Sequence, residues 1–306
     1  MIWLITCMIK QIVSYVHPPI KPWIIMDIKG LELSTQERWM LKHPWVAGVV
    51  LNRTLHYGAV DVTSRAYYEY HQLKSLTEEI KSINPNLILM IDHEGGDIIR
   101  FKSTITQPIM KYHPNLSLAY NRGCEVGRCL RDLSIDILLG PVVDEGVEGH
   151  AIARRAISAD ISEITTAASE FIRGVHSSGI LTVLKHFPGI GYAEADTHQS
   201  AAYDHRDKDA VLASASPFFK LLNKPCWVMT SHVIYSCVDT LPVSLSAKWI
   251  DLLRLESVQP VTIITDDLSM RAIKGSLSDT LISAHSAGND YVICMHQQDP
   301  LSNFLK

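Results

Sequence analysis

Short apolar runs recur eight times along the sequence and alternate with longer segments of helical pattern. The runs cover residues 23–26, 46–51, 87–91, 135–139, 180–184, 226–229, 260–264 and 291–295. Between them, residues 34–43, 67–83, 161–177, 207–222 and 246–255 carry apolar side chains three or four positions apart, the spacing of an amphipathic helix. Continuous apolar strands separated by helices are typical of a parallel sheet covered by helices. Eight such units in 306 residues predict an α/β fold, a single (β/α)8 barrel of the TIM type, with a doubly wound open sheet as the competing architecture.

Five of the eight runs lead into ionisable groups. The run ends carry Asp92-His93-Glu94, Gly140 through Asp144, Lys185-His186, Ser231-His232 and Thr265-Asp266-Asp267. In barrels of this kind the catalytic groups come from the carboxyl ends of the strands and from the loops that follow them. Because charged groups are rarely buried without a partner, a ring of them at one rim predicts a functional site there.

The fifth run opens into a loop that carries Asp196 and His198. Pro188, Gly189 and Gly191 prevent either a helix or a longer strand after Lys185-His186. A carboxylate beside an imidazole fixes its tautomer and raises its basicity, which makes a proton donor near neutral pH. The alternative is an ordinary surface turn, for which Asp is well suited.

Composition narrows the classes of function. The chain is 47% hydrophobic with a net charge of -4, which supports a large core and offers no basic surface for nucleic acid or for an anionic membrane. The cysteines show no Cys-x-x-Cys spacing, so we expect neither a disulfide framework nor a zinc site. They are Cys7, Cys124, Cys129, Cys226, Cys237 and Cys294.

Residues 1–22 are interpreted as an amino-terminal extension of uncertain structure, and residues 23–306 as one barrel catalytic domain. The apolar stretch at residues 2–9 is interrupted by Lys10 and is too short to span a membrane. A cleaved signal peptide is the less favoured alternative, because no basic segment precedes the stretch. With cysteines expected to be reduced, we place the protein in the cytoplasm, as a monomer.

Several motifs occur together and in order along the chain. They are Ile91 through Gly96 with Arg100-Phe101, Gly140 through Asp144, Ile152 through Arg155, Lys185 through Gly189, Asp196-Thr197-His198, Thr265 through Met270, and Ala287 through Asp290. On these motifs the sequence resembles family-3 glycoside hydrolases of the β-N-acetylhexosaminidase kind, which act in bacterial cell-wall recycling. The resemblance covers about residues 23 to 300.

The resemblance implies a role for each matching residue. Asp266 is the nucleophile that forms a covalent glycosyl-enzyme, so that the β configuration is retained. His198 is the general acid and then the general base, and Asp196 orients it. The residues implied to bind the hydroxyls and N-acetyl group of the sugar are Asp92, Arg100, Arg155, Lys185 and His186.

We therefore expect an exo-β-N-acetylglucosaminidase that removes terminal N-acetylglucosamine from N-acetylglucosaminyl-anhydro-muropeptides. It needs no metal and no organic cofactor, and its partner is the small carbohydrate substrate. The glycines and proline before His198 suggest that its loop closes over bound substrate. Three positions depart from the family: Asp97 replaces a usual Arg, Ile190 a usual His and Ala153 a common Gly.

Other functions remain open at this point. One is a family-3 β-glucosidase or a glycosyl phosphorylase, since an imidazole acid repels phosphate less than a carboxylate would. Another is a metal-dependent barrel hydrolase with a His and Asp ligand set. Its candidate ligands are His186, His198, His232, Asp92 and Asp266. A third is a barrel that binds muropeptides without turnover because of Asp97 and Ile190.

Overall fold

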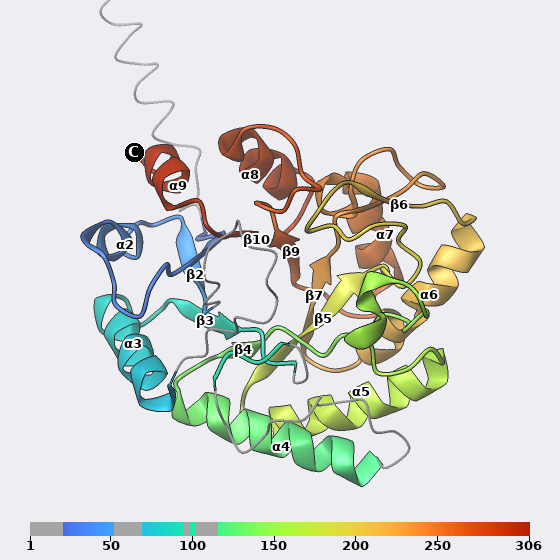
Figure 1. Cartoon of the computed structure of the whole chain (residues 1–306), viewed down its shortest axis with the longest axis horizontal. Helices are drawn as coiled ribbons and strands as arrows, with labels where there is room; N and C mark the ends of the chain where they lie inside the picture. The colour runs from blue at the N-terminus through green and yellow to red at the C-terminus, as the bar shows by residue number, and fades with distance from the viewer. Residues whose placement is uncertain (1–20, 52–68, 95–97, 102–115) are drawn as a thin grey trace, which may run out of the picture.

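Eight parallel strands close into a barrel in the computed structural model, which describes residues 21–51, 69–94, 98–101 and 116–306. The barrel strands are β1 (Ile24–Asp27), β2 (Val46–Val50), β3 (Ile88–Ile91), β4 (Ile137–Leu138), β5 (Leu181–Phe187), β7 (Cys226–Thr230), β9 (Ile263–Asp267) and β10 (Tyr291–Cys294). Strand β1 pairs with β2 on one side and with β10 on the other, so the sheet has no free edge (Figure 1). The predicted TIM-type barrel is confirmed, and the open sheet is wrong.

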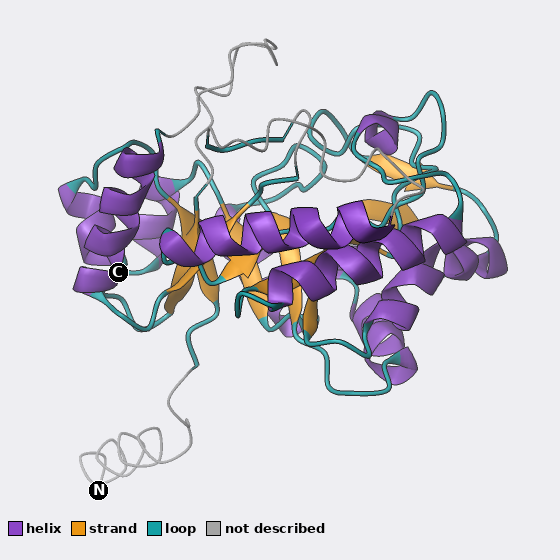
Figure 2. Cartoon of the chain, turned by 90° about the horizontal axis from the view of Figure 1, so that it is seen from below, coloured by secondary structure: helices purple, strands orange, loops and turns teal. Residues whose placement is uncertain are grey.

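The helices form an outer ring around the strands (Figures 1 and 2). They are α2 (Thr35–Met40), α3 (Tyr70–Ile83), α4 (Leu116–Asp132), α5 (Ile161–His176), α6 (Lys208–Leu221), α7 (Ala247–Glu256), α8 (Leu277–Ser286) and α9 (Gln298–Phe304). Asp160, Asp207 and Ser276 begin α5, α6 and α8 by accepting hydrogen bonds from first-turn amides. Such caps satisfy amide groups that have no partner inside the helix. Among the described helices none is long and apolar enough to cross a bilayer.

Helices α4 and α5 pack closely along one side of the barrel (Figure 1). A Cβ atom at Gly123 of α4 would lie 2.2 Å from the carbonyl oxygen of Phe171, and one at Gly174 of α5 would lie 2.2 Å from that of Tyr120. Any larger side chain at either position would push the helices apart, because backbone atoms fill the space. The two glycines therefore hold α4 against α5.

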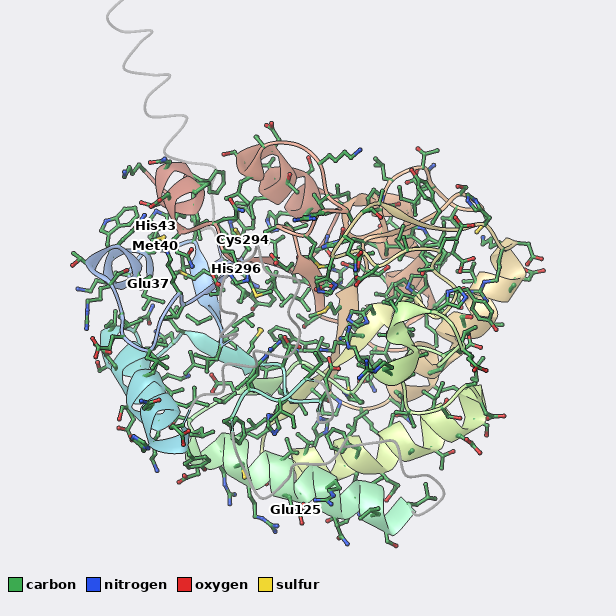
Figure 3. The ribbon with its side chains drawn as sticks, in the orientation of Figure 1. Glu37, Met40, His43, Glu125, Cys294 and His296 are labelled. Atoms are coloured by element: carbon green, nitrogen blue, oxygen red, sulfur yellow. The ribbon has the colours of Figure 1, made fainter. Side chains whose placement is uncertain are left out.

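On another side, α2 begins at a capping box and packs against α9. The Ser34 hydroxyl accepts a hydrogen bond from the Glu37 amide, and the Glu37 carboxylate accepts one from the Ser34 amide. Figure 3 labels Glu37 on α2 and Cys294 and His296 at the end of β10, and the Glu37 carboxylate also accepts a hydrogen bond from the Lys29 amide just after β1, at 2.8 Å. The buried Asp27 carboxylate at the end of β1 accepts a hydrogen bond from the His296 amide at 3.0 Å. The contact between Asp27 and His296 joins the first and last strands of the barrel at the rim.

A small sheet stands apart from the barrel. It consists of β6 (Ala202–Asp204) and β8 (Val233–Tyr235), which follow β5 and β7 in the chain and pair in parallel. Barrel strands β5 and β7 are themselves neighbours. Since both extra strands come after carboxyl ends of barrel strands, the small sheet borders the rim where the polar run ends gather. The Glu194 amide donates to the Tyr203 carbonyl of β6 at 3.0 Å, so the small sheet supports the loop that carries Asp196 and His198.

The predicted amino-terminal extension, residues 1–22, lies almost entirely outside the described residues. The five described cysteines, Cys124, Cys129, Cys226, Cys237 and Cys294, are free thiols. Cys226 and Cys294 are buried in the strands where the sequence places them.

Candidate active site

Five predicted substrate-binding residues converge at the carboxyl end of the barrel. Strand β5 supplies Lys185 and His186, and Asp92 follows β3. Arg155 follows a short 3-10 helix, Ala151–Arg154, in the loop after β4, and Arg100 lies in the segment after β3. The sequence ends the fifth run at residue 184, whereas β5 continues through Phe187, so Lys185 and His186 belong to the strand and point from a fixed backbone.

Lys185 is the centre of a buried charge network. Its Nζ lies 2.6 Å from Oδ1 of Asp92 and 2.5 Å from Oε1 of Glu94, and its side chain is only 2% exposed. Burial opposes the charge, but the two carboxylates outweigh it and hold the pKa of Lys185 above its usual range. Lys185 is therefore a fixed ammonium at the rim.

Glu94 also holds Arg155. The guanidinium donates from Nε and Nη2 to the two carboxylate oxygens at 2.9 and 2.8 Å, a bidentate pair. Burial favours the neutral acid, yet Arg155 and Lys185 together hold the pKa of Glu94 far below its usual range. One carboxylate thus fixes two cations at once.

Arg100 completes this side of the rim at longer range. Its Nη2 lies 3.8 Å from Oδ2 of Asp92, too long for a hydrogen bond but close enough for an ionic interaction. The Arg100 amide donates to Nδ1 of the buried His93, whose ring stacks on Phe101 with centroids 4.1 Å apart. The departure at Asp97 lies outside the described residues.

His186 faces this network from the other side. Its Nδ1 lies 2.8 Å from Oδ2 of Asp144, and its Nε2 lies 3.4 Å from Nη2 of Arg155. The backbone amide of His186 also donates to the Asp144 carboxylate, at 3.1 Å. All five predicted sugar-binding side chains are thus linked, directly or through Glu94, in one set of contacts.

Asp266 lies next to the last residue of β9, at the same rim. Its Oδ1 accepts a hydrogen bond from the Asp267 amide at 2.8 Å, and the side chain remains partly exposed to the barrel mouth. Burial raises the pKa, but the neighbouring imidazoles of His186, His232 and His198 outweigh it and lower the pKa of Asp266 to about 2. The carboxylate is ionised at neutral pH, as a nucleophile requires.

Asp196 and His198 form the predicted dyad. Nδ1 of His198 lies 2.9 Å from Oδ1 of Asp196, which also accepts the His198 amide. The hydrogen bond to Asp196 raises the pKa of the imidazole, and burial is the opposing effect; the charge of Asp266 raises the pKa further. The His198 side chain is 54% exposed, so Nε2 is open to a ligand.

The root of this loop is held at consecutive residues. The Gly189 carbonyl accepts the Tyr235 hydroxyl at 2.8 Å, and the Ile190 amide donates to Asp144 at 2.9 Å. Gly189 has a φ of 121°, which favours glycine. At Gly191 a Cβ would lie 2.6 Å from the Glu145 carbonyl oxygen, so only glycine fits without a shift.

The far part of the loop is also tied to its surroundings. The Ala193 carbonyl lies 2.9 Å from Nδ1 of His150, and the Thr197 carbonyl accepts from the Ala272 amide at 3.1 Å. The Ile190 side chain packs against an apolar cluster, so this departure from the family exchanges a polar group for packing. Closure of the loop over substrate stays a prediction.

Of the residues that the sequence leaves without a defined role, Glu94 and Asp144 are partners of the predicted ones, whereas His232 contacts Ser244 and the Asp267 carbonyl. Glu94 joins Lys185 to Arg155, and Asp144 holds His186. Their positions in the sequence could have indicated a role, since each follows the end of a strand. Their pairing depends on which strands are neighbours in the barrel, and that information is absent from the local sequence.

Among the described residues, the candidate ligands of a metal-dependent hydrolase are not gathered into a metal site. Both ring nitrogens of His232 are engaged, at 2.8 Å from the Ser244 hydroxyl and 2.8 Å from the Asp267 carbonyl. Across the residues that the structure describes, no group of three or more His, Cys, Asp or Glu side chains is arranged to hold a metal ion. His186 is likewise occupied by Asp144 and Arg155.

A closed parallel barrel with carboxylates, imidazoles and cations at the carboxyl ends of its strands has the architecture of a (β/α)8 enzyme. The chain belongs to glycosyl hydrolase family 3, because the model of the Glycosyl hydrolase family 3 N terminal domain matches residues 10–306. It is therefore a glycoside hydrolase, and the resemblance drawn from its motifs is confirmed.

Two kinds of relative agree with this assignment. The chain is 33% identical over 297 residues to a β-hexosaminidase of Psychromonas ingrahamii, a match that covers 92% of this chain and 85% of that protein. It is similar to the crystal structure of NagZ from Neisseria gonorrhoeae, with a TM-score of 0.80, 28% identity, and coverage of 94% of this chain and 84% of that one. A structure of the same NagZ in complex with N-trifluoroacetyl-D-glucosamine matches with a TM-score of 0.78, 26% identity, and coverage of 94% and 85%.

Proposed function

We propose that the protein is a retaining exo-β-N-acetylglucosaminidase that acts on N-acetylglucosaminyl-anhydro-muropeptides in cell-wall recycling. The observation that carries the proposal is the placement of an ionised carboxylate, Asp266, within electrostatic reach of the Asp196-bound imidazole of His198. A nucleophile and a proton donor at one rim are the two groups that retaining hydrolysis needs.

In the first step the Asp266 carboxylate attacks the anomeric carbon. The bond between that carbon and the glycosidic oxygen breaks, and the departing oxygen takes the proton from Nε2 of His198. The raised pKa of His198 favours the protonated imidazole before this step. Asp196 holds Nδ1, which directs Nε2 toward the leaving group.

In the second step water attacks the anomeric carbon of the glycosyl-enzyme. Nε2 of His198 takes a proton from the water, and the ester bond to Asp266 breaks to release the sugar with its β configuration. Glycosylation removes the negative charge of Asp266, one of the causes of the raised pKa of His198. The pKa of His198 therefore falls in the glycosyl-enzyme, which favours the neutral imidazole when a base is needed.

The sugar class is proposed from the paired cations and carboxylates of the rim. Asp92 accepts sugar hydroxyls, while Arg100, Arg155 and Lys185 donate to hydroxyl and acetyl oxygens. The complex of the related NagZ with N-trifluoroacetyl-D-glucosamine supports an N-acylglucosamine ligand. We further propose that the enzyme acts in the cytoplasm as a monomer, with no metal or organic cofactor.

Covalent trapping tests the proposal. A 2-fluoro or otherwise slow N-acetylglucosamine donor is expected to add one glycosyl mass, and peptide mapping should place it on Asp266. Asp266→Ala should give no adduct, while Asp290→Ala, an aspartate outside the rim, should still be labelled. An adduct on Asp267, or no adduct with an active enzyme, would overturn the assignment.

The acid role of His198 has its own test. His198→Ala should lose most turnover on the natural substrate and less on aryl glycosides whose leaving group needs no proton. His205→Ala provides a matched control, since this exposed histidine is paired with Glu194 and lies outside the proposed machinery. Equal losses on both substrate types in His198→Ala would refute the assignment. Product analysis with and without phosphate separates hydrolysis from phosphorolysis.

A further inference from the structure

The carboxylate of Asp144 touches two separate parts of the proposed site. Asp144 follows β4 and is completely buried. Its Oδ2 lies 2.8 Å from Nδ1 of His186, and its Oδ1 accepts the amide of Ile190 at 2.9 Å. The first contact reaches a sugar-binding residue, and the second reaches the root of the loop that carries His198.

The contact with His186 determines the tautomer of that ring. An ionised carboxylate can only accept, so Nδ1 must carry the proton. Nε2 faces Nη2 of Arg155, a permanent donor, at 3.4 Å, and this contact is satisfied when the ring is neutral and Nε2 accepts. The chain Asp144, His186, Arg155 therefore has a consistent donor and acceptor order, and it continues through the bidentate pair of Arg155 with Glu94.

The contact with Ile190 fixes the start of the loop. Gly189 beside it is held by Tyr235, and Gly191 packs against the backbone of Glu145. With three consecutive residues held, the backbone direction toward Asp196 and His198 is set at its origin. A shift at Ile190 would be transmitted along the loop to the imidazole.

We propose that Asp144 is a positioning residue that couples sugar recognition to proton delivery, by holding the His186 tautomer and the root of the His198 loop with the same carboxylate. The inference rests on the proposed function of His186 and His198.

The geometry explains why a carboxylate is required. In Asp144→Asn one of the two oxygens becomes an amide nitrogen, which donates and cannot accept. If the nitrogen faces His186, the ring must switch to the Nε2-protonated tautomer, and two donors then meet at Arg155. If it faces Ile190, two N–H groups oppose each other at the loop root. Either arrangement leaves buried donors unpaired.

Kinetics of Asp144→Asn test the proposal, with Asp136→Asn as the control. Asp136 precedes β4 at the opposite end of the strand, where it accepts the Leu89 amide and Lys81 Nζ, both at 2.8 Å. Asp144→Asn should raise KM and lower kcat by roughly 100-fold, since displacement of a reacting group by about 1 Å costs that much. The kcat loss should grow as the leaving group becomes poorer. Asp136→Asn should lower thermal stability while kcat, KM and the leaving-group dependence stay as in the wild type.

A purely structural role for Asp144 predicts a different outcome. The variant would then lose active protein by the same factor for every substrate, with KM and the leaving-group dependence unchanged, and the proposal would be overturned. Circular dichroism and thermal unfolding monitor the folded fraction.

A second measurement does not need the variant to fold. Nitrogen-15 NMR of the wild-type histidines should find His186 neutral with its proton on Nδ1, and the Nε2-protonated tautomer would overturn the proposal. This result is independent of the trapping experiment. If Asp266 is not labelled but His186 has the expected tautomer, the proposed function fails and the Asp144 contact stands.

Discussion

Replacing Glu94 by Gln tests the buried charge network directly. The change keeps the shape of the side chain but removes the charge that Arg155 and Lys185 share. Removing one partner of a buried ion pair lowers the free energy of unfolding by about 3–5 kcal/mol. The amide retains one acceptor and Arg155 is 22% exposed, so we expect the lower end, about 3 kcal/mol. For a chain of this size, that lowers Tm by roughly 6 to 10 °C.

The assay is thermal or urea unfolding with Glu170→Gln as the matched control. Glu170 also pairs with an arginine, at 2.6 Å, but Arg173 is 55% exposed, and such surface pairs contribute about 0–1 kcal/mol. In Glu94→Gln we also expect a higher KM for N-acetylglucosaminides, because both cations lose their anchor. Equal stability losses in the two variants, or an unchanged KM in Glu94→Gln, would refute the reasoning.

The network also predicts how the stability difference between the wild type and Glu94→Gln changes with pH. The pKa of Glu94 is lower in the folded state than in the unfolded chain, where it is about 4.3. Its ionisation therefore stabilises the fold above about pH 4.3, and this contribution is lost as the pH falls toward the folded-state value. The stability difference between wild type and Glu94→Gln should be constant near neutral pH and should shrink on acidification below about pH 4.3. A difference that grows in acid would contradict the network.

Two further changes probe the His198 loop. Asp196→Asn removes the main cause of the raised pKa of His198. The imidazole then loses its proton at a lower pH, so the alkaline limb of the kcat/KM profile should move to lower pH. An unchanged alkaline limb would mean that His198 is not the general acid. Gly191→Ala places a methyl group against the Glu145 carbonyl and should cost about 1–3 kcal/mol in the free energy of unfolding together with turnover. Gly30→Ala, where a Cβ would make ordinary contacts at 3.6 Å, should show neither loss, and equal behaviour of the two variants would dismiss the steric argument.

Apolar runs predicted the barrel because burial on both faces leaves a continuous signal in the sequence. The predicted strand boundaries differ from those of the structure where polar residues take part in strand pairing. The seventh run was expected at residues 260–264, whereas β9 covers Ile263–Asp267, since Thr265 and its neighbours are held by the adjacent strands. The apolar pattern does not predict α4, because its two buried glycines weaken the helical pattern while serving the contact with α5.

For the candidate site, the sequence indicated which residues would gather but not how they would be connected. The placement of Lys185 at the end of one strand and Asp92 at the end of another predicted proximity at the rim. The sharing of Glu94 between Lys185 and Arg155 arises from distances across the barrel mouth, which no local pattern encodes. The roles of Asp266, His198 and Asp196 stay predictions until labelling and kinetics test them.

The balance of charges around Lys185 has a consequence for how a ligand reaches the enzyme. The connected groups are three acids and three bases: Asp92, Glu94, Asp144, Arg100, Arg155 and Lys185. Opposite charges at contact distance cancel one another over longer range, so this wall projects little net field into the solvent. These side chains can hydrogen-bond a neutral sugar directly, but they do not attract charged molecules over long distances. The association rate is then set by diffusion, and selectivity is set by the contacts made in the site.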